Sequence, residues 1–78
     1  MKTIDYYMNL PYKMEIILDK EESGFVAILP ELPGCITVGE TIEEIVHNIL
    51  DAKRAWLEAK MEERSVIPEP LYICYPEI

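Results

Sequence analysis

The chain has 78 residues, half of them hydrophobic, and its fifteen acidic and seven basic side chains give a formal net charge of −8 at pH 7. That length leaves room for one domain with one core, because a chain this small buries only about 60% of the surface that it exposes when unfolded. The negative charge repels phosphate backbones, so direct nucleic-acid binding is not expected and a basic partner fits better.

The two cysteines, Cys35 and Cys74, are too few for the disulfide framework of a small secreted domain. The N-terminal residues do not follow the pattern of a signal peptide, and no apolar run approaches the roughly 20 residues that cross a bilayer. The sequence therefore predicts a cytoplasmic protein that does not span a membrane.

The first half of the chain reads as an arm followed by strands. Residues 1–10 form an N-terminal arm, expected to be a turn of helix or an irregular segment that Tyr6 and Tyr7 hold down. Residues 12–18 alternate in a way that predicts a half-buried strand. The polar residues 19–24 end in glycine, which is typical of a hairpin loop.

Two more strands are expected after that loop. Residues 25–29 predict the second strand, and the two prolines and the glycine of residues 30–34 predict a turn. Residues 35–38 predict a short third strand that Gly39 stops. Gly34 and Gly39 are each expected at a turn or strand end that needs an unusual φ.

A long helix is the clearest element of the second half. Thr41 and Glu44 fit a capping box, with the Thr41 hydroxyl expected on the N–H of Glu44 and the Glu44 carboxylate on that of Thr41. The helix is expected to run to about Glu63. Its apolar stripe, at helical spacing, consists of Ile42, Ile45, Val46, Ile49, Leu50, Lys53, Trp56 and Leu57.

The chain then continues through an extended, proline-containing linker over residues 65–70 to a last strand over residues 71–75. The order β-β-β-α-β predicts a single α+β domain. In it, one long helix packs on one face of a small, mainly antiparallel sheet.

The expected sheet is apolar on both faces, although one helix covers only one of them. An exposed apolar patch of several hundred Å² marks an interface in most proteins, so the second face predicts contact with a partner protein, with another copy of the chain, or with both. Tyrosines are also enriched at interfaces. The residues predicted to lie at an interface are Ile17, Val26, Ile28, Ile36, Val38, Tyr6 and Tyr7.

No set of side chains has the spacing of a catalytic or metal site. Asp19, Glu31, Glu40 and Asp51 form no spaced cluster of the kind that two-metal hydrolysis needs, and His47 has no nucleophile placed beside it. We therefore expect no enzyme, no metal and no cofactor, with His47 on the surface and Trp56 in the core under the sheet. A metal-dependent nuclease and a purely structural homo-oligomer with an unknown ligand remain the alternatives.

Several short motifs in this order resemble those of HicB antitoxins and HicB-like domains. They are Glu-Leu-Pro-Gly-Cys at residues 31–35, Gly-Glu-Thr at 39–41, Trp-Leu at 56–57 and Ile-Pro-Glu-Pro at 67–70. The motif residues, to which we assign structural roles, are Pro30, Glu31, Pro33, Gly34, Gly39, Thr41, Glu44, Trp56, Pro68 and Pro70.

The resemblance implies a partial RNase H-like fold and a role in a type II toxin–antitoxin pair. The implied partner is a HicA-type toxin, a small basic ribonuclease that cleaves mRNA and that the antitoxin silences by binding it. The family's usual C-terminal DNA-binding module has no counterpart in these 78 residues. We therefore expect a protein-binding module that forms a dimer or tetramer.

Overall fold

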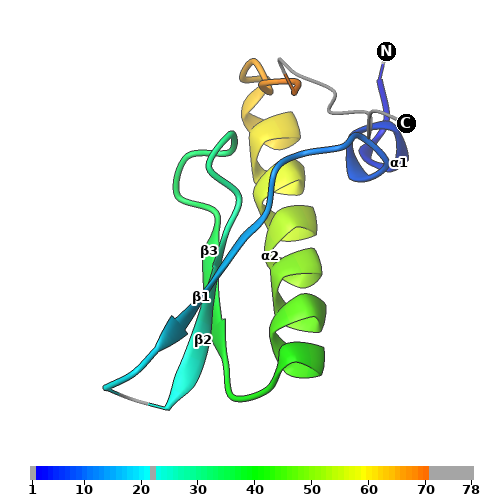
Figure 1. The fold of residues 1–78 in the computed structure, drawn as a ribbon. Coiled ribbons are helices and arrows are strands. Elements are labelled where there is room, and N and C mark those ends of the chain that lie inside the picture. Colours follow the sequence, from blue (N-terminus) through cyan, green and yellow to red (C-terminus); the bar gives the residue numbers. More distant parts are fainter. Residues whose placement is uncertain (1, 22, 71–78) are drawn as a thin grey trace, which may run out of the picture.

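The computed structural model describes residues 2–21 and 23–70. Figure 1 shows three strands and a long helix packed against one face of their sheet, which confirms the predicted α+β class. The elements, in chain order, are α1 (Ile4–Met8), β1 (Glu15–Asp19), β2 (Gly24–Ile28), β3 (Ile36–Gly39) and α2 (Ile42–Glu63). The strand predicted over residues 71–75 lies outside the described residues, and the RNase H-like likeness stays a prediction.

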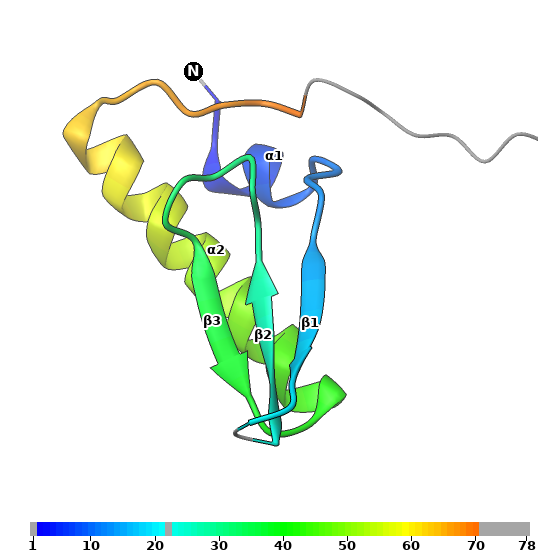
Figure 2. The same ribbon diagram turned by 60° about the vertical axis from the view of Figure 1, so that its left-hand side comes forward.

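The sheet is antiparallel with the strand order β1-β2-β3, so β2 is central, as Figure 2 shows. Its register aligns side chains in cross-strand rows. Ile17, Val26 and Val38 share one row, and Ile28 and Ile36 lie side by side in another. Because side chains alternate along a strand, Ile16 and Ala27, one residue away, face the helix instead.

The first strand begins at Glu15, and the predicted start at residue 12 is wrong. The backbone N–H of Tyr12 bonds to the carbonyl of Leu10 at 2.9 Å, and that of Lys13 donates to Glu31 Oε1 at 2.7 Å. These two residues therefore bond to local and loop acceptors, and the ladder with β2 begins only at the pair Glu15 and Ile28.

Helix α2 ends at Glu63, as predicted, and Arg64 closes it in a left-handed conformation with φ 56°. At its start, the Thr41 hydroxyl accepts the N–H of Glu44 at 3.0 Å. The reciprocal half of the predicted capping box is wrong, because the Glu44 carboxylate accepts the N–H of Glu40 at 3.4 Å rather than that of Thr41. None of the described helices combines the length and the apolar character that crossing a bilayer requires.

The core lies between α2 and the strands β2 and β3. Its cluster of buried residues consists of Ala27, Leu29, Leu32, Cys35, Ile45 and Ile49. The helix approaches β3 closely at Gly39, where a Cβ would lie 3.0 Å from the backbone N of Ile45. Gly39 is thus needed for this close approach, while only Gly34 has the predicted unusual conformation, with φ 86°.

The apolar stripe of α2 is wider than the part that the sheet covers. Ile45, Ile49 and Leu57 are buried, but Ile42, Val46 and Leu50 are 52%, 37% and 43% exposed. The Asn48 amide donates to the carbonyl of Val38 on β3 at 2.9 Å, so that flank of the helix faces β3. At 100° per residue, Val46 and Leu50 lie about 160° around the helix from Asn48, on the opposite flank, toward β1.

Candidate protein-binding surface

The face of the sheet opposite α2, which we call the outer face, carries the predicted aliphatic interface residues. Ile17, Ile36 and Val38 are 48%, 55% and 66% exposed, and Val26 and Ile28 are half-buried between them. The two cross-strand rows bring all five together across the three strands. The structure thus places Ile17, Val26, Ile28, Ile36 and Val38 on one continuous surface.

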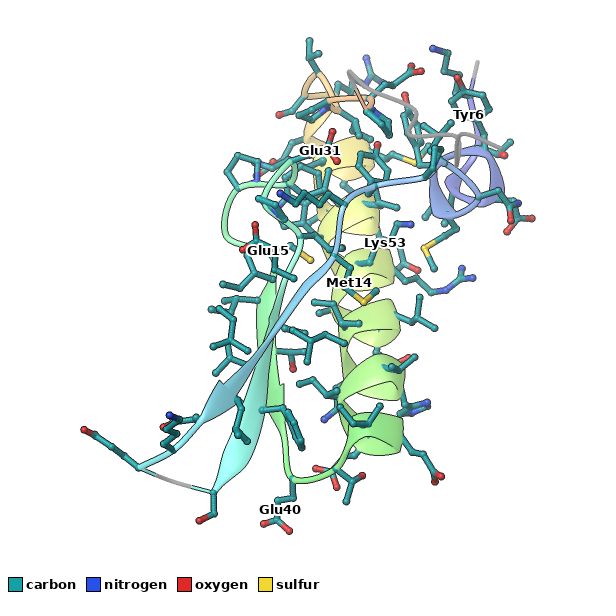
Figure 3. All side chains as sticks on the ribbon, in the orientation of Figure 1. Tyr6, Met14, Glu15, Glu31, Glu40 and Lys53 are labelled. Atoms are coloured by element: carbon teal, nitrogen blue, oxygen red, sulfur yellow. The ribbon has the colours of Figure 1, made fainter. Side chains whose placement is uncertain are left out.

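An antiparallel sheet with one solvated face normally alternates apolar residues inward and polar residues outward. Glu15, which lies in the row of Ile28 and Ile36 and forms an ion pair with Lys13 at 3.5 Å, follows that rule. Figure 3 shows Glu15 and Met14 on opposite sides of the strand, with Met14 directed toward α2. The five aliphatic side chains depart from the rule. Apolar side chains that are exposed together in this way are common at the contact surfaces of proteins.

Carboxylates border one end of the outer face. A hollow of about 290 Å³ there is lined by Val26 and Val38 together with Asp19, Glu40 and Glu44. Glu40 projects at this end of the sheet in Figure 3. The apolar rows therefore continue into a negatively charged rim, which would attract lysine and arginine side chains of a partner.

The same carboxylates do not form a metal site. Among residues 2–21 and 23–70, no group of three or more histidine, cysteine, aspartate or glutamate side chains is placed to hold a metal ion. His47 is on the surface, as predicted, with Nε2 3.3 Å from Asp51 Oδ2.

Tyr6 and Tyr7 lie apart from the outer face, on α1, which packs against α2 (Figures 1 and 2). Their rings meet edge to face with centroids 5.2 Å apart. The Tyr6 hydroxyl donates to Glu69 Oε1 at 2.9 Å, and Lys2 forms an ion pair with the same carboxylate. Hydrogen bonds from Lys2 and Tyr6 lower the pKa of Glu69. Tyr6 thus fastens the linker, and contact of the two tyrosines with a partner stays a prediction.

The motif residues around the turn hold it against its neighbours. Glu31 accepts the backbone N–H of Lys13, and the carbonyl of Pro33 accepts the Trp56 Nε1–H at 2.8 Å. Trp56 is half-buried beside the core cluster. Pro30 is exposed in the turn.

The last motif residues fix the path of the linker. The Tyr12 hydroxyl donates to the carbonyl of Pro68. Burial, followed by the charge of Glu69, raises the pKa of Tyr12 to about 12. Pro70, half-buried, is the last described residue.

Sequence reasoning missed the role of Lys53. Its side chain is only 5% exposed, and Nζ donates to the carbonyl of Met8 at 3.1 Å. Burial lowers the pKa of Lys53 and raises that of the nearby Cys35 thiol. The available signal was a lysine in the apolar stripe of a helix, where a buried charge needs a fixed partner.

The comparisons with known proteins agree on one family. A family model described as "HicB_like antitoxin of bacterial toxin-antitoxin system" matches residues 12–75. The chain is 39% identical over 57 residues to a UPF0150 protein of Thermoplasma acidophilum, covering 72% of this chain and 83% of the relative. It is 38% identical over 61 residues to a UPF0150 protein of Synechocystis sp., covering 78% and 80%.

A phage protein gives a further match. The chain is 32% identical over 66 residues to an uncharacterized 14.9 kDa protein in the rep-hol intergenic region of Haemophilus phage HP1, covering 80% of this chain and 50% of the relative. No solved structure matches significantly.

Proposed function

This chain belongs to the HicB-like antitoxin family, and we propose that it neutralises a small, basic, mRNA-cleaving ribonuclease of the HicA type by forming a complex with it. The observation that carries this proposal is the outer face, on which five aliphatic side chains are gathered in two cross-strand rows. The toxin covers this face, and burying apolar surface supplies most of the binding free energy.

Charge supports a basic partner. The net charge of −8 and the carboxylates beside Val26 and Val38 raise the association rate with a positively charged protein and disfavour nucleic acid as the ligand. The chain acts by occluding the toxin and performs no catalysis itself. It works in the cytoplasm, where mRNA is the substrate of its partner.

In the absence of toxin, two copies of the chain cover the same face. An exposed aliphatic surface of this kind favours self-association, and a symmetric pair buries the patch of both copies at once. Sedimentation equilibrium at micromolar concentration is then expected to give a dimer, and a charge placed in the patch to give a monomer. A wild-type monomer at those concentrations would contradict the self-association.

Binding is tested with the product of the short basic gene that we expect beside this chain's own. Isothermal titration calorimetry measures the affinity, and an mRNA cleavage assay measures the inhibition. Val38→Asp places a charge in the patch at a position already 66% exposed, so the fold tolerates it. It is expected to weaken the affinity at least about tenfold, as substitutions at the centre of an interface do.

The matched control is Val66→Asp, the same change at a valine that is 92% exposed and lies in the linker after α2. This variant is expected to bind and inhibit like the wild type. Equal weakening by both variants, or no complex with the wild type, would contradict the proposal.

A further inference from the structure

The hollow at one end of the outer face combines apolar walls with carboxylates. It measures about 290 Å³ and lies where the end of β1, the start of β2 and the end of β3 meet the first turn of α2. Its lining residues are Asp19, Gly24, Phe25, Val26, Val38, Gly39, Glu40 and Glu44. Because Val26 and Val38 also belong to the outer face, the hollow continues the apolar rows.

Two glycines line the hollow between β2 and β3. A Cβ at Gly24 would lie 3.0 Å from the carbonyl O of Gly39, and a Cβ at Gly39 would lie 3.0 Å from the backbone N of Ile45. Neither position accepts a side chain without a shift of the neighbouring backbone, so backbone atoms line the hollow there. Val38, which is 66% exposed, stands beside them, and the hollow is therefore accessible from the outer face.

The carboxylates of Glu40 and Glu44 give the hollow a negative charge. The Glu44 carboxylate accepts the backbone N–H of Glu40 at 3.4 Å, and the Glu44 N–H donates to the Thr41 hydroxyl at 3.0 Å, so both residues are positioned within the chain itself. Figure 3 shows Glu40 projecting from this end of the sheet. Within residues 2–21 and 23–70, neither glutamate forms an ion pair, so their charge is available to a cation of another molecule.

We infer that this hollow receives the side chain of one lysine or arginine of the protein that covers the outer face. The aliphatic stem of such a side chain lies against Val26 and Val38, and its cationic head reaches Glu40 and Glu44. Charge complementarity selects this occupant, because an apolar side chain would leave the carboxylates uncompensated and an anion would be repelled. The inference rests on the proposed function, since it names one contact of the same partner.

A cationic side chain at this place also fixes the direction in which the partner lies on the sheet. At the other end of β1, Glu15 already forms an ion pair with Lys13 at 3.5 Å. The two ends of the outer face therefore differ in charge. A partner turned end to end would place its cation beside a carboxylate that is already compensated, which disfavours that orientation.

Disulfide tethering tests the hollow without the toxin, in the 78-residue chain carrying Cys74→Ser. Val38→Cys places a thiol in the wall of the hollow, and Val66→Cys, at a valine that is 92% exposed in the linker, is the matched control. Each variant is equilibrated with cystamine and cysteamine, which leave a lysine-like ammonium side chain on the thiol. A parallel sample with 2-hydroxyethyl disulfide and mercaptoethanol leaves a neutral side chain of similar length. Mass spectrometry measures both mixed disulfides.

We expect the ammonium side chain to be preferred over the neutral one about twofold to fivefold more at position 38 than at position 66, the range of an exposed ion pair. Adding Glu40→Gln and Glu44→Gln to Val38→Cys is expected to remove this preference, while the glutamine oxygen still accepts the backbone N–H. An equal preference at both positions would overturn the inference, and so would a preference that survives the two glutamines.

A second measurement tests whether a partner uses the hollow. Glu40→Lys and Glu58→Lys change the net charge equally, but Glu58 lies on α2 away from the hollow. Calorimetry with the toxin is expected to give an affinity at least about tenfold weaker for Glu40→Lys than for Glu58→Lys, because like charges then meet in the complex. Equal affinities would overturn the inference. Absence of a wild-type complex, with the tethering preference intact, would contradict the proposed function instead.

Discussion

The ammonium group of Lys53 lies 4.9 Å from the centre of the Tyr12 ring, and Lys53 is buried. Its hydrogen bond to the carbonyl of Met8 connects α2 to the end of α1. One side chain on the long helix therefore holds both the arm and the residue that contacts the linker, although these segments are distant in sequence.

Lys53→Met keeps the length of the side chain and removes the charge, so the carbonyl of Met8 loses its donor. We expect the free energy of unfolding to fall by about 1.5–3 kcal/mol, the net value of a hydrogen bond to a charged group. Urea denaturation followed by circular dichroism measures this change.

Lys60→Met is the matched control for that substitution. Lys60 also lies over an aromatic ring, 5.4 Å from the centre of Trp56, but its side chain is 36% exposed. Lys60→Met is expected to lower the free energy of unfolding by less than about 1 kcal/mol. If the two variants were equally stable, burial of Lys53 would not be the source of its contribution.

The raised pKa of Tyr12 predicts that the folded chain loses stability in alkaline solution. Its pKa is raised from 10.0 to about 12 in the folded chain, so the folded state retains a proton that the unfolded state releases. The stabilisation is complete below pH 10 and is lost as the pH rises toward 12. Tyr12→Phe has no such group, so the stability difference between wild type and variant should shrink over this range. A difference that stays constant from pH 9 to 12 would refute the assignment.

The sequence predicted the periodic elements well because local rules determine them. The three strands, the turn of residues 30–34 and the end of α2 at Glu63 follow from alternation, proline and helical spacing. The aliphatic outer face was also predictable, since one helix covers one face of a sheet. Whether that face binds a partner is a separate question, and the binding experiment answers it.

Tertiary contacts decided what the sequence did not predict. The strand β1 starts late because Glu31, eighteen residues away from Lys13, takes the Lys13 N–H. Tyr6 bonds to Glu69 across 63 residues, which no local pattern indicates. The exposure of Ile42, Val46 and Leu50 depends on where α2 lies over the sheet, and helical periodicity alone cannot fix that position.

The close approach of Gly39 to α2 leaves too little space for a side chain at this position. Gly39→Ala would place a Cβ 3.0 Å from the backbone N and 3.1 Å from the Cα of Ile45. We expect a loss of about 1–3 kcal/mol in unfolding free energy, as for other overpacked interiors. Because the nearest atoms are backbone, adding Ile45→Val should not restore stability, and recovery in the double variant would show that the clash involves the side chain instead.

We expect the hydrogen bond of the Trp56 side chain to contribute measurably to the attachment of the turn of residues 30–34 to α2. Its Nε1–H donates to the carbonyl of Pro33 at 2.8 Å. Replacing it by 3-benzothienylalanine during chemical synthesis of the chain keeps the ring system and removes the donor. The expected loss in the free energy of unfolding is about 0.5–1.5 kcal/mol, the net value of one such bond.

Trp56→Phe should cost more, because it also removes packing volume beside the core. Thermal and urea denaturation compare the three proteins. An analogue as stable as the wild type would mean that Trp56 acts through packing alone, and amide exchange in residues 30–35 would then be unchanged as well.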